Sequence, residues 1–362
     1  MLTILLLGLP TLVLALATGL SFVRIPHGIV RTLAFPRLQI LVLAALLVPA
    51  TFFLVIDNHW RQGLVLVQVL VVLVQAVLIA KFTPLWKRQS VRWDGDPAGD
   101  NTLSVFSFNV KMSNRRYDEA LAVARDRDPD VAIFMETDAG WAEALEPLAE
   151  TLPHGVREPL DNAYGLLVFS RLPIEEARID YLVTDDVPSF SGILRLRDGQ
   201  RFRLLVVHPE PPVPAMDTVG RDAELLLVAD RAASESLPVV VTGDLNDVAW
   251  SHTTRLFQRV SGLLDPRVGR GFYNTFDARY PPMRWPLDHL FHDPRFKLID
   301  MHRLPACGSD HFPMLFRLAL TPEPAALDQP ESDAGDRREA DGIEAKGDRL
   351  ERDAIGTDWE DA

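Results

Sequence analysis

Polar residues with metal-binding and phosphate-binding side chains follow several short apolar runs in the middle of the chain. Carboxylate oxygens are the ligands that Mg²⁺ and Mn²⁺ prefer, while amide and imidazole groups can donate hydrogen bonds to phosphate oxygens. A carboxylate beside a histidine also fixes the tautomer and charge of the ring. Together these groups predict a site for a divalent metal ion and a phosphoryl group. They belong to Asn109, Glu136, His208, Asp244, Asn246, Asp288, Asp310 and His311.

The apolar runs have the length and composition of buried strands. A strand fixes the backbone of its last residue at the edge of a sheet, so several strands with polar ends can bring those ends to one pocket. Helical patterns lie between the runs, and this alternation predicts a layered α/β domain with sheets buried between helices. Strands are expected at residues 103–108, 131–135, 166–169, 202–207 and 239–242, and helices at 117–127, 141–150 and 220–234.

Each polar motif is weak evidence when it stands alone. An Asp after a Gly is most often a turn residue, an Asn at a strand end is commonly a cap, and a buried His is usually a satisfied core group. The number and order of the motifs favour a site. Among the other polar residues, Asp138 is expected to cap a helix and Cys307 to be a packing residue. His289 competes with its neighbour for a role, whereas His252 and His292 fit no motif.

The ordered set resembles the endonuclease/exonuclease/phosphatase superfamily, which includes deoxyribonuclease I-like nucleases and sphingomyelinases. Its most specific pieces are Gly243-Asp244-Leu245-Asn246 and Ser309-Asp310-His311-Phe312-Pro313, and Val207-His208-Pro209 precedes both. The resemblance covers roughly residues 101–320. It implies a four-layered α/β sandwich, and it implies hydrolysis of a phosphate ester by in-line attack of water on phosphorus.

The resemblance also implies which residues hold the metal. Glu136 would be the principal ligand, aided by Asn109 and Asp310. The ion would be Mg²⁺ or Mn²⁺, because all of these donors are oxygen atoms.

The remaining polar residues would act on water and phosphate. By the same resemblance, Asp244 would orient or deprotonate the attacking water, and Asn246 would hold the phosphate. His208 would bind phosphoryl oxygens, as would His311 paired with Asp288. Catalysis would then consist mainly of positioning and of electrostatic stabilisation of the transition state.

The first hundred residues contain three apolar runs of membrane-spanning length, at 2–23, 38–56 and 64–80. At a rise of roughly 1.5 Å per residue, such runs cross a hydrocarbon core of about 30 Å. A cleaved signal peptide would need a basic start and a shorter apolar core, and helices of a soluble bundle would need polar faces. The runs therefore predict three transmembrane helices, in a multi-pass protein of the cell (inner) membrane in contact with the lipid bilayer.

Two patterns disagree on the side of the membrane that the catalytic domain occupies. Lys and Arg residues gather in the first loop and after the third run, which favours a cytoplasmic catalytic domain. The N-terminus also resembles a bacterial branch of the superfamily in which a small membrane domain precedes the catalytic domain. In that branch the catalytic domain can face outward, so the sequence leaves the side open.

Composition divides the chain into a membrane domain at 1–82, a linker at 83–100, a catalytic domain at 101–320 and an acidic tail at 321–362. The tail has few branched apolar residues to offset the entropy of ordering, which predicts disorder. Net charge is +4 over residues 1–100, −8 over 101–320 and −9 over 321–362. An acidic domain without a basic stripe repels a polyanion at long range, so the charge weakens the nuclease interpretation without removing it.

The sequence favours an enzyme that hydrolyses phosphodiester or phosphomonoester bonds. The substrate would be nucleic acid, a phospholipid or a small phosphodiester, and no stable protein partner is predicted. An alternative is a catalytically inactive, membrane-anchored scaffold of the same fold, which would leave gaps in the catalytic set; all eight positions are filled. A transporter would need ionisable residues inside the apolar runs, and these have essentially none.

Overall fold

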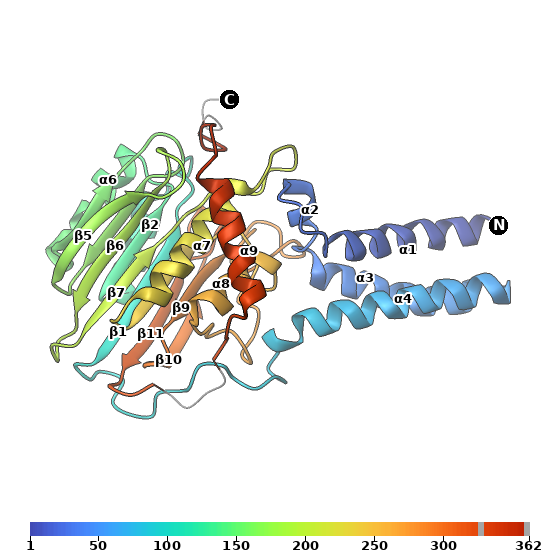
Figure 1. The fold of residues 1–362 in the computed structure, drawn as a ribbon, viewed down its shortest axis with the longest axis horizontal. Helices are drawn as coiled ribbons and strands as arrows, with labels where there is room; N and C mark the ends of the chain where they lie inside the picture. Colours follow the sequence, from blue (N-terminus) through green and yellow to red (C-terminus); the bar gives the residue numbers. More distant parts are fainter. Residues whose placement is uncertain (325–328, 358–362) are drawn as a thin grey trace.

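The structure, a computed structural model, describes residues 1–324 and 329–357. Figure 1 shows three long helices that extend side by side away from a layered α/β domain. Each is long and apolar enough to cross a membrane, which confirms the three predicted helices. They are α1 (Leu2–Leu20), α3 (Arg37–Leu54) and α4 (Asn58–Ile79), with the short α2 (Gly28–Thr32) between α1 and α3 and the turn η1 (Ala80–Phe82) after α4.

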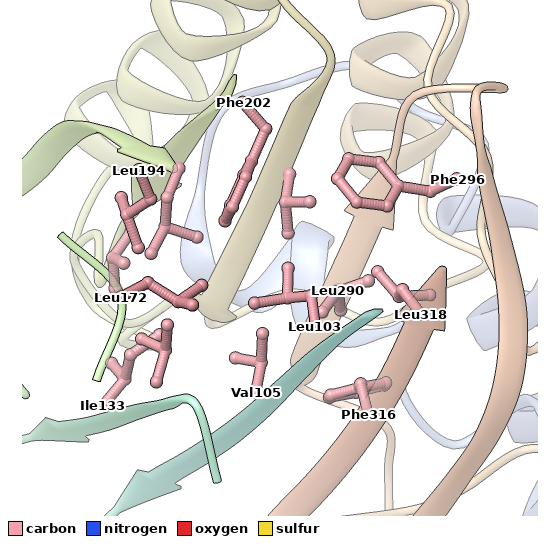
Figure 2. Close-up of a cluster of buried hydrophobic side chains, with 14 of the residues drawn as sticks. Leu103, Val105, Ile133, Leu172, Leu194, Phe202, Leu290, Phe296, Phe316 and Leu318 are labelled. Carbon is pink, nitrogen blue, oxygen red and sulfur yellow. The ribbon is translucent and has the colours of Figure 1, made fainter. Parts of the chain in front are cut away.

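Two sheets face each other in the α/β domain. Their strand orders are β10-β11-β1-β2-β4-β3 and β5-β6-β7-β8-β9. Apolar side chains of the two inner faces form one core, as Figure 2 shows for Val105 and Ile133 of the first sheet and Leu194 and Phe202 of the second. The strands are β1 (Thr102–Asn109), β2 (Val131–Met135), β3 (His154–Glu158), β4 (Leu166–Ser170), β5 (Ile174–Tyr181), β6 (Pro188–Arg195), β7 (Arg201–Val206), β8 (Val239–Asp244), β9 (Asp288–His292), β10 (Phe296–Arg303) and β11 (Met314–Leu320).

Helices cover the outer face of each sheet. On the first sheet, Ala120 and Trp141 pack against Phe134. On the second sheet, Leu225 and Phe257 belong to a separate buried cluster. The resulting order of helix, sheet, sheet and helix confirms the predicted four-layered α/β sandwich. The helices are α5 (Tyr117–Arg127), α6 (Ala139–Leu145), η2 (Glu146–Glu150), α7 (Val219–Ser234) and α8 (His252–Ser261).

The acidic C-terminal part differs from the predicted disorder. Ala334–Gly347 form helix α9, which packs on α7 and α8, and Figure 1 shows it lying against α7. Ala340 and Ile343 enter the apolar cluster around α7. The prediction of disorder is wrong for this helix, because average composition does not register a narrow apolar stripe at helical spacing. Residues 325–328 and 358–362 of the predicted tail lie outside the described residues.

The segment expected as a linker, residues 83–100, runs along the α/β domain. The backbone N–H of Trp93 donates to the carbonyl of Leu298 at 2.8 Å. The hydroxyl of Ser90 lies 2.7 Å from Nε2 of the buried His292. These contacts hold the segment against the domain although it forms no helix, so it differs from a free tether.

The membrane-proximal loop between α1 and α3 also packs on the α/β domain. Arg31 forms an ion pair of 2.7 Å with the buried Asp222 of α7. The indole of Trp250 donates to the carbonyl of Ala34 at 2.7 Å. Because one of these contacts is an ion pair with a buried carboxylate, separating the two parts would remove one of the two arginines that pair with Asp222, the other being Arg221.

Candidate active site

The predicted strand ends meet where the two sheets face each other. β1 and β2 are parallel neighbours, as are β7 and β8, so each pair has its carboxyl ends at one edge. Asn109 ends β1, Glu136 follows β2 and Asp244 ends β8. The Asn109 amide donates to Oε1 of Glu136 at 2.7 Å and to Oδ2 of Asp244 at 3.0 Å. One side chain therefore links the polar ends of both sheets.

His311 lies between two buried carboxylates. Its Nδ1 is 2.8 Å from Oδ2 of Asp288, and its Nε2 is 3.4 Å from Oδ2 of Asp244. Burial opposes a charge on the ring, but Asp288 and Asp244 outweigh it and raise the pKa of His311 to about 10. Burial raises the pKa of Asp288 above its usual value. The neighbouring Asp244 adds to this shift, and the two carboxylates share the one cation, His311. The ring is therefore an imidazolium at neutral pH.

The loop before His311 is tied to β1 by Ser309. The Ser309 hydroxyl donates to the carbonyl of Asn109 at 2.8 Å and accepts the backbone N–H of His311 at 2.9 Å. Gly308 begins the turn with φ +93°, and a Cβ there would lie 2.4 Å from Oδ1 of Asn114. Glycine is thus required for the turn that brings His311 to the carboxylates.

His208 approaches the same carboxylates as a neutral ring. Its Nε2 is 3.9 Å from both Oε1 of Glu136 and Oδ2 of Asp244. Burial lowers the pKa of His208 to about 4. Its Nδ1 is buried and has no hydrogen-bond partner within the described ranges. A proton on Nε2 satisfies this arrangement, and this N–H can donate a hydrogen bond to a phosphoryl oxygen.

The turn after β8 holds Asn246 beside the site. Asn246 has the left-handed φ of +50°, and its backbone N–H donates to Oδ1 of Asp244 at 2.9 Å. Its side-chain amide donates to the carbonyl of Pro209 at 2.9 Å. At Gly243, with φ +146°, a Cβ would lie 1.9 Å from the carbonyl oxygen of Val207. Glycine is therefore needed for β8 to approach the end of β7.

Glu136 lies where a negative charge would have little compensation. Its side chain is 21 % exposed, and a single amide, that of Asn109, donates to it at 2.7 Å. Burial raises the pKa of Glu136 to about 7, and the nearby Asp310 and Asp244 add to the shift. Asp310 in turn lies 3.1 Å from Nζ of Lys111. A cation near Glu136 would relieve the repulsion between these carboxylates.

The converging side chains line a cavity of 310 Å³. A larger cavity of 590 Å³ lies at the amino end of β1, but its lining holds none of the predicted site residues. The smaller cavity is therefore the candidate active site. Its lining comprises Lys111, Glu136, Ala163, Tyr164, His208, Pro211, Asp244, Asn246, Phe276, Asp310, His311, Ile355 and Gly356.

Comparison with known proteins agrees with this geometry. The sequence profile of the endonuclease/exonuclease/phosphatase family matches residues 106–311. The chain belongs to this family. No curated protein in the comparison matches it.

Two solved structures share the family's deoxyribonuclease I-like fold with this chain. A humanised TDP2 of D. rerio with 14 mutations has a TM-score of 0.50 and 17% identity, and the match covers 60% of this chain and 99% of that one. An endonuclease/exonuclease/phosphatase from Beutenbergia cavernae has a TM-score of 0.50 and 20% identity, with 61% and 72% covered. At these identities the likeness concerns the fold alone.

This family member has a candidate metal site at Asp244, Asp288 and His311, whose ligand atoms lie within 4.8 Å of one another. Both ring nitrogens of His311 already face carboxylates, so in this arrangement the imidazolium itself is the cation between them. The oxygen donors of Asn109, Glu136 and Asp310 remain the predicted set for a hard ion. The pKa of Glu136 is raised by burial and by the neighbouring Asp310 and Asp244, and a cation beside these carboxylates would offset their repulsion.

Sequence reasoning missed several residues of the cavity lining. Lys111 follows β1 with φ +60° and contacts Asp310, and its position two residues after Asn109 was an available signal. The ring of Phe276 lies 5.0 Å from that of His311. Ile355 comes from the C-terminal part and carried no sequence signal.

Four other residues that stood out in the sequence lie outside the candidate active site and have roles in capping or packing. Asp138 accepts the N–H of Trp141, which confirms the predicted helix cap. Burial lowers the pKa of His289 to about 3 and that of His292 to about 4, so both rings are neutral. Cys307 is buried in the core, and burial raises the pKa of its thiol to about 12, so it is unreactive at neutral pH.

Proposed function

We propose that this chain is a membrane-anchored, divalent-metal-dependent phosphoesterase that hydrolyses phosphodiester or phosphomonoester bonds. The supporting observation is the opposite charge state of two histidines around one carboxylate. His311 is an imidazolium and His208 is neutral, and both face Oδ2 of Asp244. Such a pair gives one fixed positive charge and one neutral hydrogen-bond donor beside a possible water-binding carboxylate.

Glu136, with Asn109 and Asp310, would hold Mg²⁺ or Mn²⁺. When bound, the ion would supply positive charge that polarises the phosphoryl group. The chemistry of the donors supports this assignment, because carboxylate and amide oxygens suit a hard cation. Within the described residues, the hydrogen bond to Glu136 comes from the neutral amide of Asn109 and not from a cationic side chain, which also supports it.

The protein's own residues would carry out the remaining steps. Burial opposes ionisation of Asp244, but His311 and the hydrogen bonds from Asn246 and Asn109 together outweigh it and lower the pKa of Asp244, so this carboxylate is ionised. It would accept a hydrogen bond from water and orient the oxygen toward phosphorus. The new P–O bond would form as the bond to the leaving oxygen breaks; the water would pass its proton to Asp244, and the leaving oxygen would keep the electron pair of the broken bond and take up a proton from solvent where its basicity requires one. His208 would donate to a phosphoryl oxygen, and His311 would stabilise the added negative charge.

The test is hydrolysis of bis-p-nitrophenyl phosphate by the full-length chain in detergent. With Mg²⁺ or Mn²⁺ we expect release of p-nitrophenol, loss of release on addition of a chelator, and recovery when metal is restored in excess. Refusal of both this diester and p-nitrophenyl phosphate by folded protein would contradict the proposal. It would favour the alternative of a membrane-anchored scaffold.

We further propose that the catalytic domain lies on the cytoplasmic side. Arg24, Arg31 and Arg37 precede or begin α3, at the end of the helical bundle that contacts the α/β domain, and Lys/Arg near a membrane end favours the cytoplasm. The test is protease digestion of an epitope appended after Ala362. Digestion in inside-out vesicles but not in intact cells would support this orientation, and the reverse pattern would contradict it.

A further inference from the structure

The last described residues of the chain form one side of the catalytic pocket. Ile355 and Gly356 line the same cavity as His208 and Asp244. The hydroxyl of Tyr164 donates to the carbonyl of Ile355. All of the C-terminal residues involved lie beyond 106–311, the part that matches the family profile. This side of the pocket is therefore built by residues that follow the last strand of the sandwich, β11.

The C-terminal segment is fastened to the loop that follows His208. Arg352 donates to both oxygens of Glu210, at 2.6 and 2.9 Å, and to both oxygens of Asp217, at 3.2 and 3.1 Å. The backbone N–H of Ile355 donates to Glu210 as well, at 2.9 Å. Glu210 is 2 % exposed, so its charge depends on these donors. The contacts fix the segment in one position over the pocket.

The chain before this segment is held equally firmly. Arg259 of α8 forms two hydrogen bonds of 2.8 Å with Asp336 of α9. Gly347, near the end of α9, approaches α7 so closely that a Cβ would lie 2.4 Å from Cβ of Ala223. Because α9 is docked at both ends, the residues after it reach the pocket with little slack.

We propose that residues 352–356, here called the C-terminal wall, are a specificity element of the catalytic pocket. The C-terminal wall admits a compact phosphate ester and excludes an internal phosphodiester of a polynucleotide. This proposal rests on the proposed phosphoesterase activity. A compact ester is one whose phosphoryl group carries one or two small substituents, or a phosphodiester in a lipid headgroup.

Size and charge both support this assignment. The cavity of 310 Å³ is at the low end of the range of about 300–1,000 Å³ for small-molecule sites, so it cannot enclose nucleotides on both sides of a phosphate. Residues 101–320 and 321–362 carry net charges of −8 and −9. The acidic surface would repel a polynucleotide, and the C-terminal wall would block its path on that side of the pocket.

The test compares three substrates with the full-length chain in detergent. They are bis-p-nitrophenyl phosphate, phospholipid vesicles and a fluorescein-labelled single-stranded oligonucleotide. The variants are a chain that ends at Leu350 and Arg352→Ala, with the exposed Arg349→Ala as the matched control. Folding of each is checked by its melting temperature.

We expect the parent and Arg349→Ala to cleave the compact ester and to leave the oligonucleotide intact. In both wall variants the rate on the oligonucleotide relative to the diester should rise at least about tenfold, because several charge-assisted hydrogen bonds that hold the wall are lost. The vesicle arm distinguishes a lipid headgroup from a soluble ester. An unchanged ratio in both variants would overturn the proposal, and so would loss of diester hydrolysis in a folded variant.

A binding measurement separates this proposal from the proposed activity. Glu136→Gln chains with and without residues 351–362 are titrated against the labelled oligonucleotide by fluorescence anisotropy. Removal of the segment should tighten binding at least about tenfold, even if no protein hydrolyses any ester. Equal affinity would overturn the role of the C-terminal wall. Absence of hydrolysis in every chain would instead overturn the phosphoesterase proposal.

Discussion

The floor and the wall of the catalytic pocket are built in different ways. The floor consists of Glu136, Asp244 and His311, which line the pocket at or beside strand ends. Asn109 and Asp288 lie behind them and contact them directly. The C-terminal wall reaches the pocket from outside the family domain and is held by Arg352. Sheet backbone thus fixes the chemical groups, while side chains of distant segments fix the entrance. Substitutions in the C-terminal wall can therefore alter which phosphate esters enter the pocket without altering the groups that carry out hydrolysis.

The largest expected effect is at the floor. Glu136→Gln keeps the shape of the side chain but removes the charge that would hold the metal, so kcat should fall by about 10³-fold or more. Diester hydrolysis by the full-length chain measures it, and circular dichroism should remain that of the parent. Glu143→Gln, an exposed change on the neighbouring α6, is the control and should be fully active. Activity near the parent's in Glu136→Gln would remove Glu136 from the floor.

A smaller loss is expected at Asp288. Asp288→Asn removes the nearer of two anionic partners of His311, at 2.8 Å, so burial then disfavours the imidazolium. We expect kcat to fall by about 10²-fold, measured at a single neutral pH. The exposed Asp185→Asn serves as control. His311→Ala combined with Asp288→Asn should be no slower than His311→Ala alone, and additive losses would show that the two residues do not act as a unit.

For a change that loosens the C-terminal wall, we expect altered substrate selectivity without a change in kcat on the diester. Tyr164→Phe removes one hydrogen bond, the one to the carbonyl of Ile355. The ratio of kcat/KM on oligonucleotide to kcat/KM on diester should rise by about two- to tenfold, with kcat on the diester nearly unchanged. Tyr181→Phe, at an exposed tyrosine of β5, should leave the ratio as it is. A fall in kcat without a change in the ratio would mean that Tyr164 supports the catalytic residues of the floor and not the C-terminal wall.

The smallest effect concerns a buried carboxyl behind the wall, which should influence stability alone. Burial raises the pKa of Glu224 to about 7, although the Ser189 hydroxyl donates to it at 2.6 Å. The unfolded chain loses this proton near pH 4.5, so the parent loses stability as pH rises from there to about 7. Glu224→Gln should raise the free energy of unfolding by about 1–3 kcal/mol above pH 7 and leave it unchanged near pH 4.

Melting temperatures of the full-length chain at pH 4 and pH 8 measure that difference. A matched change at Glu235, a half-buried carboxylate whose pKa is lowered, should not produce the same gain at pH 8. An equal gain for Glu224→Gln at both pH values would mean that the carboxyl is not titrating.

Sequence reasoning succeeded where local order carries the information. Apolar runs predicted β1, β2, β4, β7 and β8, and a polar residue at each strand end predicted the convergence of Asn109, Glu136 and Asp244. The pairing of His311 with Asp288 also agreed with the structure at 2.8 Å. The position of a side chain at a strand end is predictable because the sheet fixes the backbone of that residue at its edge.

The C-terminal wall could not be predicted in the same way. Arg352 and Glu210 are 142 residues apart, and neither lies in a motif. The acidic composition of the tail concealed α9, whose capping box at Asp333 and apolar Ala340 and Ile343 were present in the sequence. A window of helical length would have registered that stripe, whereas an average over the whole tail removed it.

The ion pair of Arg31 with Asp222 has a geometric consequence. Asp222 also contacts Arg221 at 2.7 Å, and Arg221 donates to the carbonyl of Asn246 at 3.0 Å, so bonded contacts run from the membrane-proximal loop to the catalytic turn. A domain on a flexible linker would sample many heights above the bilayer, whereas these contacts fix the α/β domain to the membrane-proximal loop. These contacts hold Asp244 at one height above the membrane surface, so under the proposed mechanism a scissile bond in a membrane-bound substrate would have to lie at that height.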